Sequence, residues 1–204
     1  MKKWHTILGE LHFMAIALPG ARNMFGCLQN AILPLSKNRV YLSKGVHQAL
    51  NDFRWIAEDI ATRPTRLAKL ILVALSDEGH HNASCKGSGG VWFPGDAIDS
   101  MKGWSQDIPI VWRLQWPDYI TRSLITSSNL AGIITNSDLE LAGALIHLEA
   151  LVQTFDVHER TIVRKGDNLN TTFWERKGSN ITNSPPAYLL SRFGMHQRYH
   201  RYVP

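Results

Sequence analysis

Hydrophobic positions in the first part of the chain follow the period of an α-helix. From about Trp4 to Thr62, apolar residues recur every three or four positions, as they do on the buried side of a helix. Pro19-Gly20 interrupts this pattern, and Ser43 is a suitable N-cap for the helix that comes next. We therefore expect a small helical region over residues 1–64, with helices over about 4–18, 22–33 and 44–62.

The pattern changes beyond residue 64. Apolar residues 70–75 form either a buried strand or the end of a helix, and the small residues and glycines that follow indicate a hairpin. The expected elements are a hairpin over 76–93, a polar loop over 94–108, a strand over 110–114, a helix over 136–155, a strand over 159–164, a helix over 186–193 and a last strand over 199–203. This order predicts a mixed α/β domain over residues 65–204.

The helix expected from residue 136 combines an apolar stripe with polar residues in its first turns. Because the stripe has helical spacing, we expect it to lie against the sheet. It consists of Leu141, Leu145, Leu148 and Val152. Glu140 lies off this stripe, and Ser137-x-x-Glu140 has the spacing of a capping box, in which the glutamate bonds back to the start of the helix. Asp138 adds favourable negative charge to the first turn.

Two carboxylates meet at one edge of the sheet if this topology is correct. Glu140 lies at a helix start, and Asp167 follows the strand expected over 159–164. Carboxylates from separate elements form an all-oxygen site that suits Mg²⁺. Two such ions stabilise the attacking and leaving oxygens when a phosphodiester is hydrolysed. The pattern therefore favours nuclease chemistry over the capping interpretation of Glu140.

Four motifs, in this order, resemble the ribonuclease H domain of retrotransposon polyproteins. They are Gly87-Ser88-Gly89-Gly90-Val91-Trp92-Phe93, Thr135-Asn136-Ser137-Asp138-Leu139-Glu140-Leu141-Ala142, Arg176-Lys177-Gly178-Ser179 and the segment from His196 to Pro204. The helical region before them is similar to the thumb or connection segment of a reverse transcriptase. The resemblance implies a ribonuclease H-like fold over residues 65–204 and Mg²⁺-dependent hydrolysis of the RNA strand in RNA–DNA hybrids.

The resemblance also implies roles for individual residues. Glu140 would bridge the metal ions, and Asp167 would be the second acidic ligand. Family members read Asp-Ala-Ser before the glycines, whereas this chain reads Asn82-Ala83-Ser84, and a neutral amide is a weaker metal ligand than a carboxylate. The family continues to a final helix with a further aspartate, beyond the equivalent of Pro204. We therefore expect weak or absent cleavage from a domain truncated at its C-terminus.

Two alternatives stay open at this point. One is a non-catalytic module that binds nucleic acid or another partner, and the other is a decayed reading frame with no selected role. Its formal net charge of +5 and sequence pI of about 9.4 favour a polyanionic partner over an acidic one. Trp174, Arg176 and Lys177 are the residues we expect to contact a hybrid duplex, by stacking and through the phosphates.

The remaining features of the sequence bear on location and metal binding. Cys27 and Cys85 are too few for a disulfide framework, and no apolar stretch approaches the ~20 residues that span a bilayer. We expect an intracellular protein, cytoplasmic or nuclear. The histidine pairs His80-His81 and His196/His200 lack companion ligands at zinc-site spacing, so we expect core or solvated histidines.

Overall fold

The computed structural model describes residues 2–16, 18, 20–31, 42–64, 77–93, 108–177 and 185–202. The chain divides into two compact units, one of residues 1–71 with 174–199 and one of residues 72–173 with 200–204. Within the described ranges, every helix is too short or too polar to cross a bilayer. The expected apolar segment at 70–75 and almost all of the expected loop at 94–108 lie outside these ranges.

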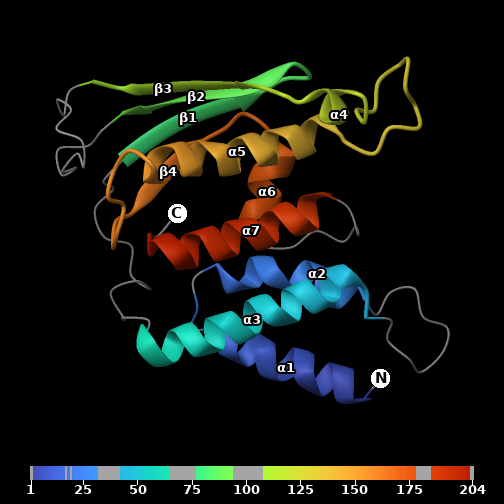
Figure 1. Ribbon diagram of the computed structural model, residues 1–204, viewed down its shortest axis with the longest axis vertical. Helices are drawn as coiled ribbons and strands as arrows, with labels where there is room; N and C mark the ends of the chain where they lie inside the picture. The colour runs from blue at the N-terminus through green and yellow to red at the C-terminus, as the bar shows by residue number, and fades with distance from the viewer. Residues whose placement is uncertain are drawn as a thin grey trace. The chain divides into compact units, whose positions relative to one another are not determined.

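The first unit is helical (Figure 1). Its N-terminal elements are α1 (Lys2–Ile16), the 3-10 helix η1 (Ala21–Met24), α2 (Phe25–Asn30) and α3 (Lys44–Thr62). They confirm the helices expected in this region, although residues 32 and 33 lie outside the described ranges. Ser43 caps α3 as expected, because its Oγ accepts a hydrogen bond of 3.3 Å from the N–H of Val46. The buried side chains at the centre of this unit include Met24, Leu28 and Ile56.

Helix α7 (Pro185–His200) groups with these N-terminal helices, although it follows the sheet in the sequence. Arg198 donates to Asp59 of α3 across 2.6 Å, and each of the two side chains is only 6% exposed. Arg63 also pairs with Asp59. The unit therefore contains a buried charged cluster, and burial of this kind is tolerated only when each charge is paired.

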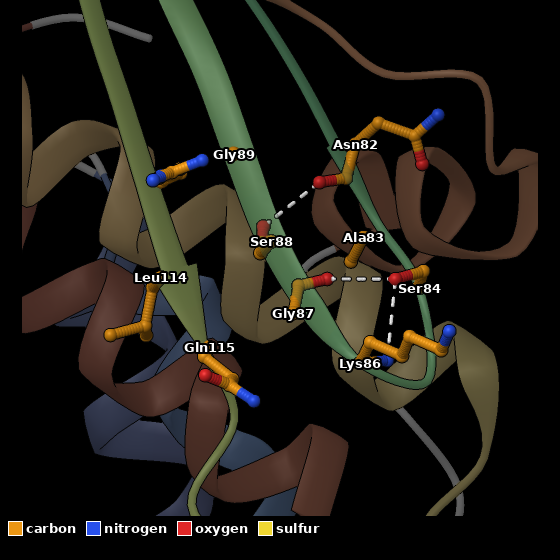
Figure 2. A pocket seen from close by; sticks show the side chains of 10 residues that line it. Asn82, Ala83, Ser84, Lys86, Gly87, Ser88, Gly89, Leu114 and Gln115 are labelled. Atoms are coloured by element: carbon orange, nitrogen blue, oxygen red, sulfur yellow. Dashed lines mark hydrogen bonds between the residues drawn. The ribbon is translucent and has the colours of Figure 1, made fainter.

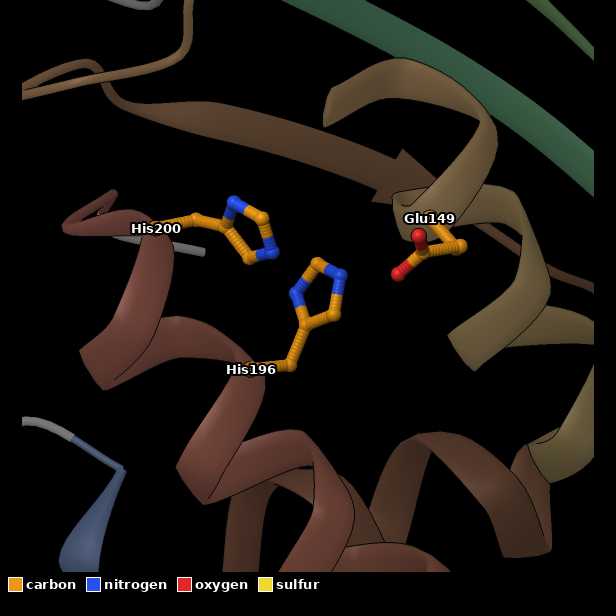
Figure 3. A group of neighbouring side chains, drawn as sticks. All are labelled: Glu149, His196 and His200. Carbon is orange, nitrogen blue, oxygen red and sulfur yellow. The ribbon is translucent and has the colours of Figure 1, made fainter. Parts of the chain in front are cut away.

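The expected strand over 199–203 is wrong for the described residues 199–202, and residue 203 lies outside the described ranges. Residues 199 and 200 continue α7, which also extends beyond the helix expected over 186–193. The buried side of its last turns is made of Gln197 and Arg198, so hydrophobic periodicity does not mark these turns as helical. His196 and His200 therefore lie on successive turns of one helix, where both side chains are partly buried (Figure 3).

The second unit is built on a four-stranded sheet with the order β3-β2-β1-β4. Its strands are β1 (Asp77–Ala83), β2 (Gly87–Phe93), β3 (Ile110–Gln115) and β4 (Ile162–Lys165). Strands β1, β2 and β3 are antiparallel neighbours, whereas β4 pairs with β1 in parallel. The hairpin, the third strand and the mixed α/β order are confirmed, with β4 beginning later than expected.

Helices α4 (Asp118–Thr121) and α5 (Asn136–Val152) and the first turns of α6 (Leu169–Lys177) complete the second unit. Helix α5 lies along one face of the sheet (Figure 1). Leu141 and Leu148 of its apolar stripe are fully buried, as expected. Gly143 and His147, which are not part of this stripe, contact the sheet: a Cβ at Gly143 would lie 2.5 Å from Ser88 Oγ, and His147 stacks on Trp92 of β2. Helix α5 is thus buried on more than one side.

Candidate functional site

Asn82 and Asp167 come together at the edge of the sheet where β1 and β4 end. The parallel register aligns His80 with Lys165, and continuing it by two residues aligns positions 82 and 167. Side chains that are lateral neighbours in a sheet point to the same face. Asn82 Nδ2 lies 3.5 Å from Asp167 Oδ2, a long hydrogen bond between two exposed side chains.

Glu140 reaches this edge because α5 is capped by other residues. Thr135 Oγ1 accepts a hydrogen bond of 3.2 Å from the N–H of Asp138, and Asp138 Oδ2 accepts one of 2.7 Å from the N–H of Thr135. The alternative interpretation of Ser137 and Glu140 as a capping box is therefore not what the structure forms. The reciprocal pair lies two residues earlier, which leaves the Glu140 carboxylate available for other contacts.

Ser137 instead connects α5 to the start of α6. Its Oγ accepts from the side-chain amides of Asn168 at 3.4 Å and Asn170 at 3.3 Å, and its carbonyl accepts from Thr171 Oγ1 at 3.2 Å. Asn168 Oδ1 also accepts from the N–H of Thr171 at 3.0 Å, so it caps α6. These contacts hold the segment after β4, which includes Asp167, against the start of α5.

The Glu140 carboxylate is buried beside the end of β1. Glu140 is only 3% exposed. Its carboxylate accepts a hydrogen bond from the backbone N–H of Ala83. Burial raises the pKa of Glu140, the Ala83 hydrogen bond opposes this, and the charge of Asp167 raises the pKa further. Among the described residues, Glu140 Oε2 has no hydrogen-bond partner. A buried carboxylate oxygen without a donor favours either a proton or a cation at this position.

The residues present fit a magnesium site in part. Glu140 and Asp167 supply carboxylate oxygens from two elements, which is the ligand type that Mg²⁺ prefers, and Glu140 Oε2 is unpartnered within the described chain. Asn82 differs, because its NH₂ group faces Asp167 as a donor. The set therefore offers two carboxylates and a neutral amide.

A buried cluster of aromatic and histidine side chains lies between α5 and the sheet. His147 is fully buried and stacks on Trp92 with ring centroids 4.0 Å apart. Trp112 Nε1 donates to His147 Nδ1 at 2.7 Å, so a neutral ring carries its proton on Nε2. Burial lowers the pKa of His147 to about 2. Gly79 leaves room for this ring, since a Cβ there would lie 2.3 Å from His147 Nε2.

The two histidines on β1 have different environments. His81 lies near His147, with ring centroids 5.2 Å apart, and burial lowers the pKa of His81 to about 4. His80 is exposed and lies 2.8 Å from Glu78 Oε1. The contacts of His81 and His80 are those of a partly buried and a solvated histidine. The cluster around His147 was not foreseen from the sequence.

An open groove of about 880 Å³ begins at Asn82 and extends over β2 to β3 (Figure 2). Its described lining includes Ser84, Lys86, Gly89, Arg113 and Gln115. Sequence analysis missed Lys86 and Arg113, which are separated by 26 intervening positions in the chain and share a groove only because of strand pairing.

Trp174, Arg176 and Lys177 lie in the last turns of α6, a helix that the sequence pattern does not predict. Arg176 and Lys177 are exposed and Trp174 is partly buried. These three residues group with the first unit, and their contact with a hybrid duplex stays a prediction.

Comparison with known protein families, with curated proteins and with solved structures found no match to this chain. No family membership is therefore assigned.

Proposed function

We propose that this chain is part of a retroelement reverse transcriptase and that its second unit is a ribonuclease H-like domain with weak or no hydrolysis of RNA in RNA–DNA hybrids. The observation that carries the proposal is the arrangement of Glu140, Asp167 and position 82 at one edge of the sheet. Three elements distant in sequence contribute these residues: α5, the end of β4 and the end of β1.

The strand arrangement supports the proposal. Because β1 and β4 are adjacent and parallel, their carboxyl ends meet at the same edge, where functional groups of open α/β sheets collect. Glu140 and Asp167 would hold Mg²⁺ at this edge. Bound there, the ion would stabilise the charge that develops on a phosphodiester and lower the pKa of attacking water.

The amide at position 82 is the reason for expecting weak activity. With Asn82, the three residues carry at most two negative charges, whereas an aspartate at position 82 would add a third. The Asn82 NH₂ group also occupies one oxygen of Asp167 at 3.5 Å. Since burial raises the pKa of Glu140, the uncharged form of that residue competes with metal binding. All three effects reduce metal affinity.

A cleavage assay on labelled RNA–DNA hybrid, with Mg²⁺ or Mn²⁺, tests the proposal. Asn82→Asp should increase the cleavage rate by about tenfold or more, because ligand changes of this kind alter metal affinity by at least as much as second-shell changes do. The double variant Asn82→Asp/Glu140→Gln should be inactive, which controls for contaminating nuclease. Full activity of the unaltered chain, abolished by Glu140→Gln, would contradict the expectation of weak cleavage.

The second candidate is a module that binds nucleic acid without cleaving it. The observation that favours it is the Asn82–Asp167 hydrogen bond, which uses the carboxylate for a structural contact. Hybrid binding with no cleavage by Asn82→Asp, in a variant whose circular dichroism matches the unaltered chain, would support this candidate and reject the nuclease.

A further inference from the structure

We propose that the groove over β1, β2 and β3 binds the sugar–phosphate backbone of a polynucleotide, with Lys86 and Arg113 contacting phosphates. This proposal rests on the proposed function, because the groove continues the sheet edge that carries Glu140 and Asp167. We call this edge the acidic edge, and the groove would extend it into a path for the nucleic acid. Lys86 and Arg113 are distinct from Arg176 and Lys177, which lie on α6.

The strand register aligns residues of the groove with those of the acidic edge in one row across the strands. Asn82 of β1 pairs with Gly89 of β2, and Gly89 pairs with Arg113 of β3, so these three positions share one face of the sheet. Asp167 extends the row on the other side of Asn82. Because neighbouring strands are about 4.8 Å apart, Arg113 lies roughly 10 Å from Asn82 along this row.

Within the described chain, no side chains fill the middle of the groove, because β2 contributes glycines there. Gly87 and Gly89 carry no side chains, and Figure 2 shows them on the strand between Asn82 and the β3 residues Leu114 and Gln115. A Cβ at Gly87 would lie 2.3 Å from the carbonyl oxygen of Leu114. The close approach of β2 and β3 thus requires glycine at this position, and it leaves the surface open to an extended ligand.

Hydrogen bonds hold Lys86 at the end of the groove. Ser84 Oγ accepts from the N–H of Lys86 at 3.3 Å and donates to the carbonyl of Gly87 at 3.2 Å (Figure 2). The carbonyl of Lys86 accepts from the N–H of Trp116 at 3.1 Å, which joins the turn to the end of β3. The backbone of Lys86 is therefore fixed, and only its exposed side chain needs ordering when a ligand binds.

The charge of the groove selects an anion. Lys86 and Arg113 are both exposed, and none of the described lining residues is acidic. Ser84 and Gln115 add neutral polar groups that hydrogen-bond phosphate or sugar oxygens. Lys86 and Arg113 form no ion pair within the described part of the chain, so a ligand displaces no intramolecular partner there.

The length of the row favours a polymer over a single phosphate. One strand of a duplex carries a phosphate at every nucleotide, so a strand that follows the roughly 10 Å from Asn82 to Arg113 brings more than one phosphate to this row. A strand with one phosphate at the acidic edge would place another near Arg113. Two cations along one groove suit this repeated charge better than an isolated anion.

Fluorescence anisotropy with a labelled RNA–DNA hybrid in EDTA tests the groove without any cleavage. Lys86→Gln and Arg113→Gln should each weaken binding on the order of eightfold at 0.1 M salt and reduce the slope of log affinity against log salt by about 0.7 to 0.9, the loss of one phosphate contact. Arg122→Gln is the charge-matched control. Its side chain is 81% exposed outside the groove, and it should bind like the unaltered chain.

Equal weakening by all three variants would mean that net charge alone acts, and it would overturn the proposal. Unchanged binding by Lys86→Gln and Arg113→Gln would also overturn it, as would no binding of hybrid by the unaltered chain. The two proposals fail separately. Weakened binding by the groove variants with no cleavage by Asn82→Asp rejects the nuclease and keeps the groove, and the reverse result rejects the groove alone.

Discussion

Acid should destabilise the second unit through the buried histidines His81 and His147. Burial lowers the pKa of His147 to about 2 and that of His81 to about 4, against an ordinary value near 6.5. Between the folded and unfolded pKa values, the unfolded chain binds a proton that the folded chain does not, so stability rises with pH. The contribution of each residue is therefore complete above about pH 6.5 and is lost as the pH falls below that value.

The size of the effect follows from linkage. Lowering the pH from 7.5 to 5 should reduce the free energy of unfolding by about 2 kcal/mol for each of the two histidines, since unfolded His protonates over this range and the folded groups stay neutral. Carboxylates change stability over the same range. A variant that removes one histidine isolates its share.

His147→Phe is the informative variant, because it keeps an aromatic ring against Trp92 and removes the titrating group. It loses the hydrogen bond from Trp112, which lowers stability at every pH. The difference between pH 7.5 and pH 5, measured by urea unfolding followed by tryptophan fluorescence, should shrink by about 2 kcal/mol relative to the unaltered chain. An equal pH dependence in both proteins would refute the reasoning. It would mean that His147 is hydrated or already protonated in the folded state.

Two further predictions concern packing. Gly79→Ala should lower the free energy of unfolding by about 1 to 3 kcal/mol, because the new Cβ would lie 2.3 Å from His147 and 2.4 Å from Trp92. The measurement is urea unfolding. Gly9→Ala is the control and should be neutral or stabilising, because nothing lies within 4 Å of a Cβ at that position. Arg198→Met should cost about 3 kcal/mol or more in the same measurement, because it leaves the buried Asp59 carboxylate with one cationic partner fewer. A free energy of unfolding equal to that of the unaltered chain would contradict this prediction.

The identity of the cap at the start of α5 illustrates where sequence reasoning reaches its limit. Thr135-x-x-Asp138 and Ser137-x-x-Glu140 both have the spacing of a capping box. Only the path of the chain entering the helix decides between them, and the structure forms the first pair. The choice matters for function, because Glu140 would be occupied in the alternative arrangement.

Helix α6 and the end of α7 were missed for a related reason. Local propensity does not favour a helix at Asn170-Thr171-Thr172, since these residues compete for backbone hydrogen bonds. Contacts with Ser137 and the Asn168 cap supply what the local sequence lacks. In α7 the buried side ends in polar residues such as Arg198, whose partner Asp59 lies far away in the sequence.

The sequence by itself determined the local elements and the chemical types at the candidate site: the glycine-rich hairpin, the helix with Glu140 and the strand that ends near Asp167. These depend on spacing and composition within short segments. Tertiary structure alone decided that Asn82 contacts Asp167, that Ala83 hydrogen-bonds Glu140 and that Lys86 shares a groove with Arg113. The physical reason is that strand register and helix docking are set by contacts between distant segments, which no local pattern encodes.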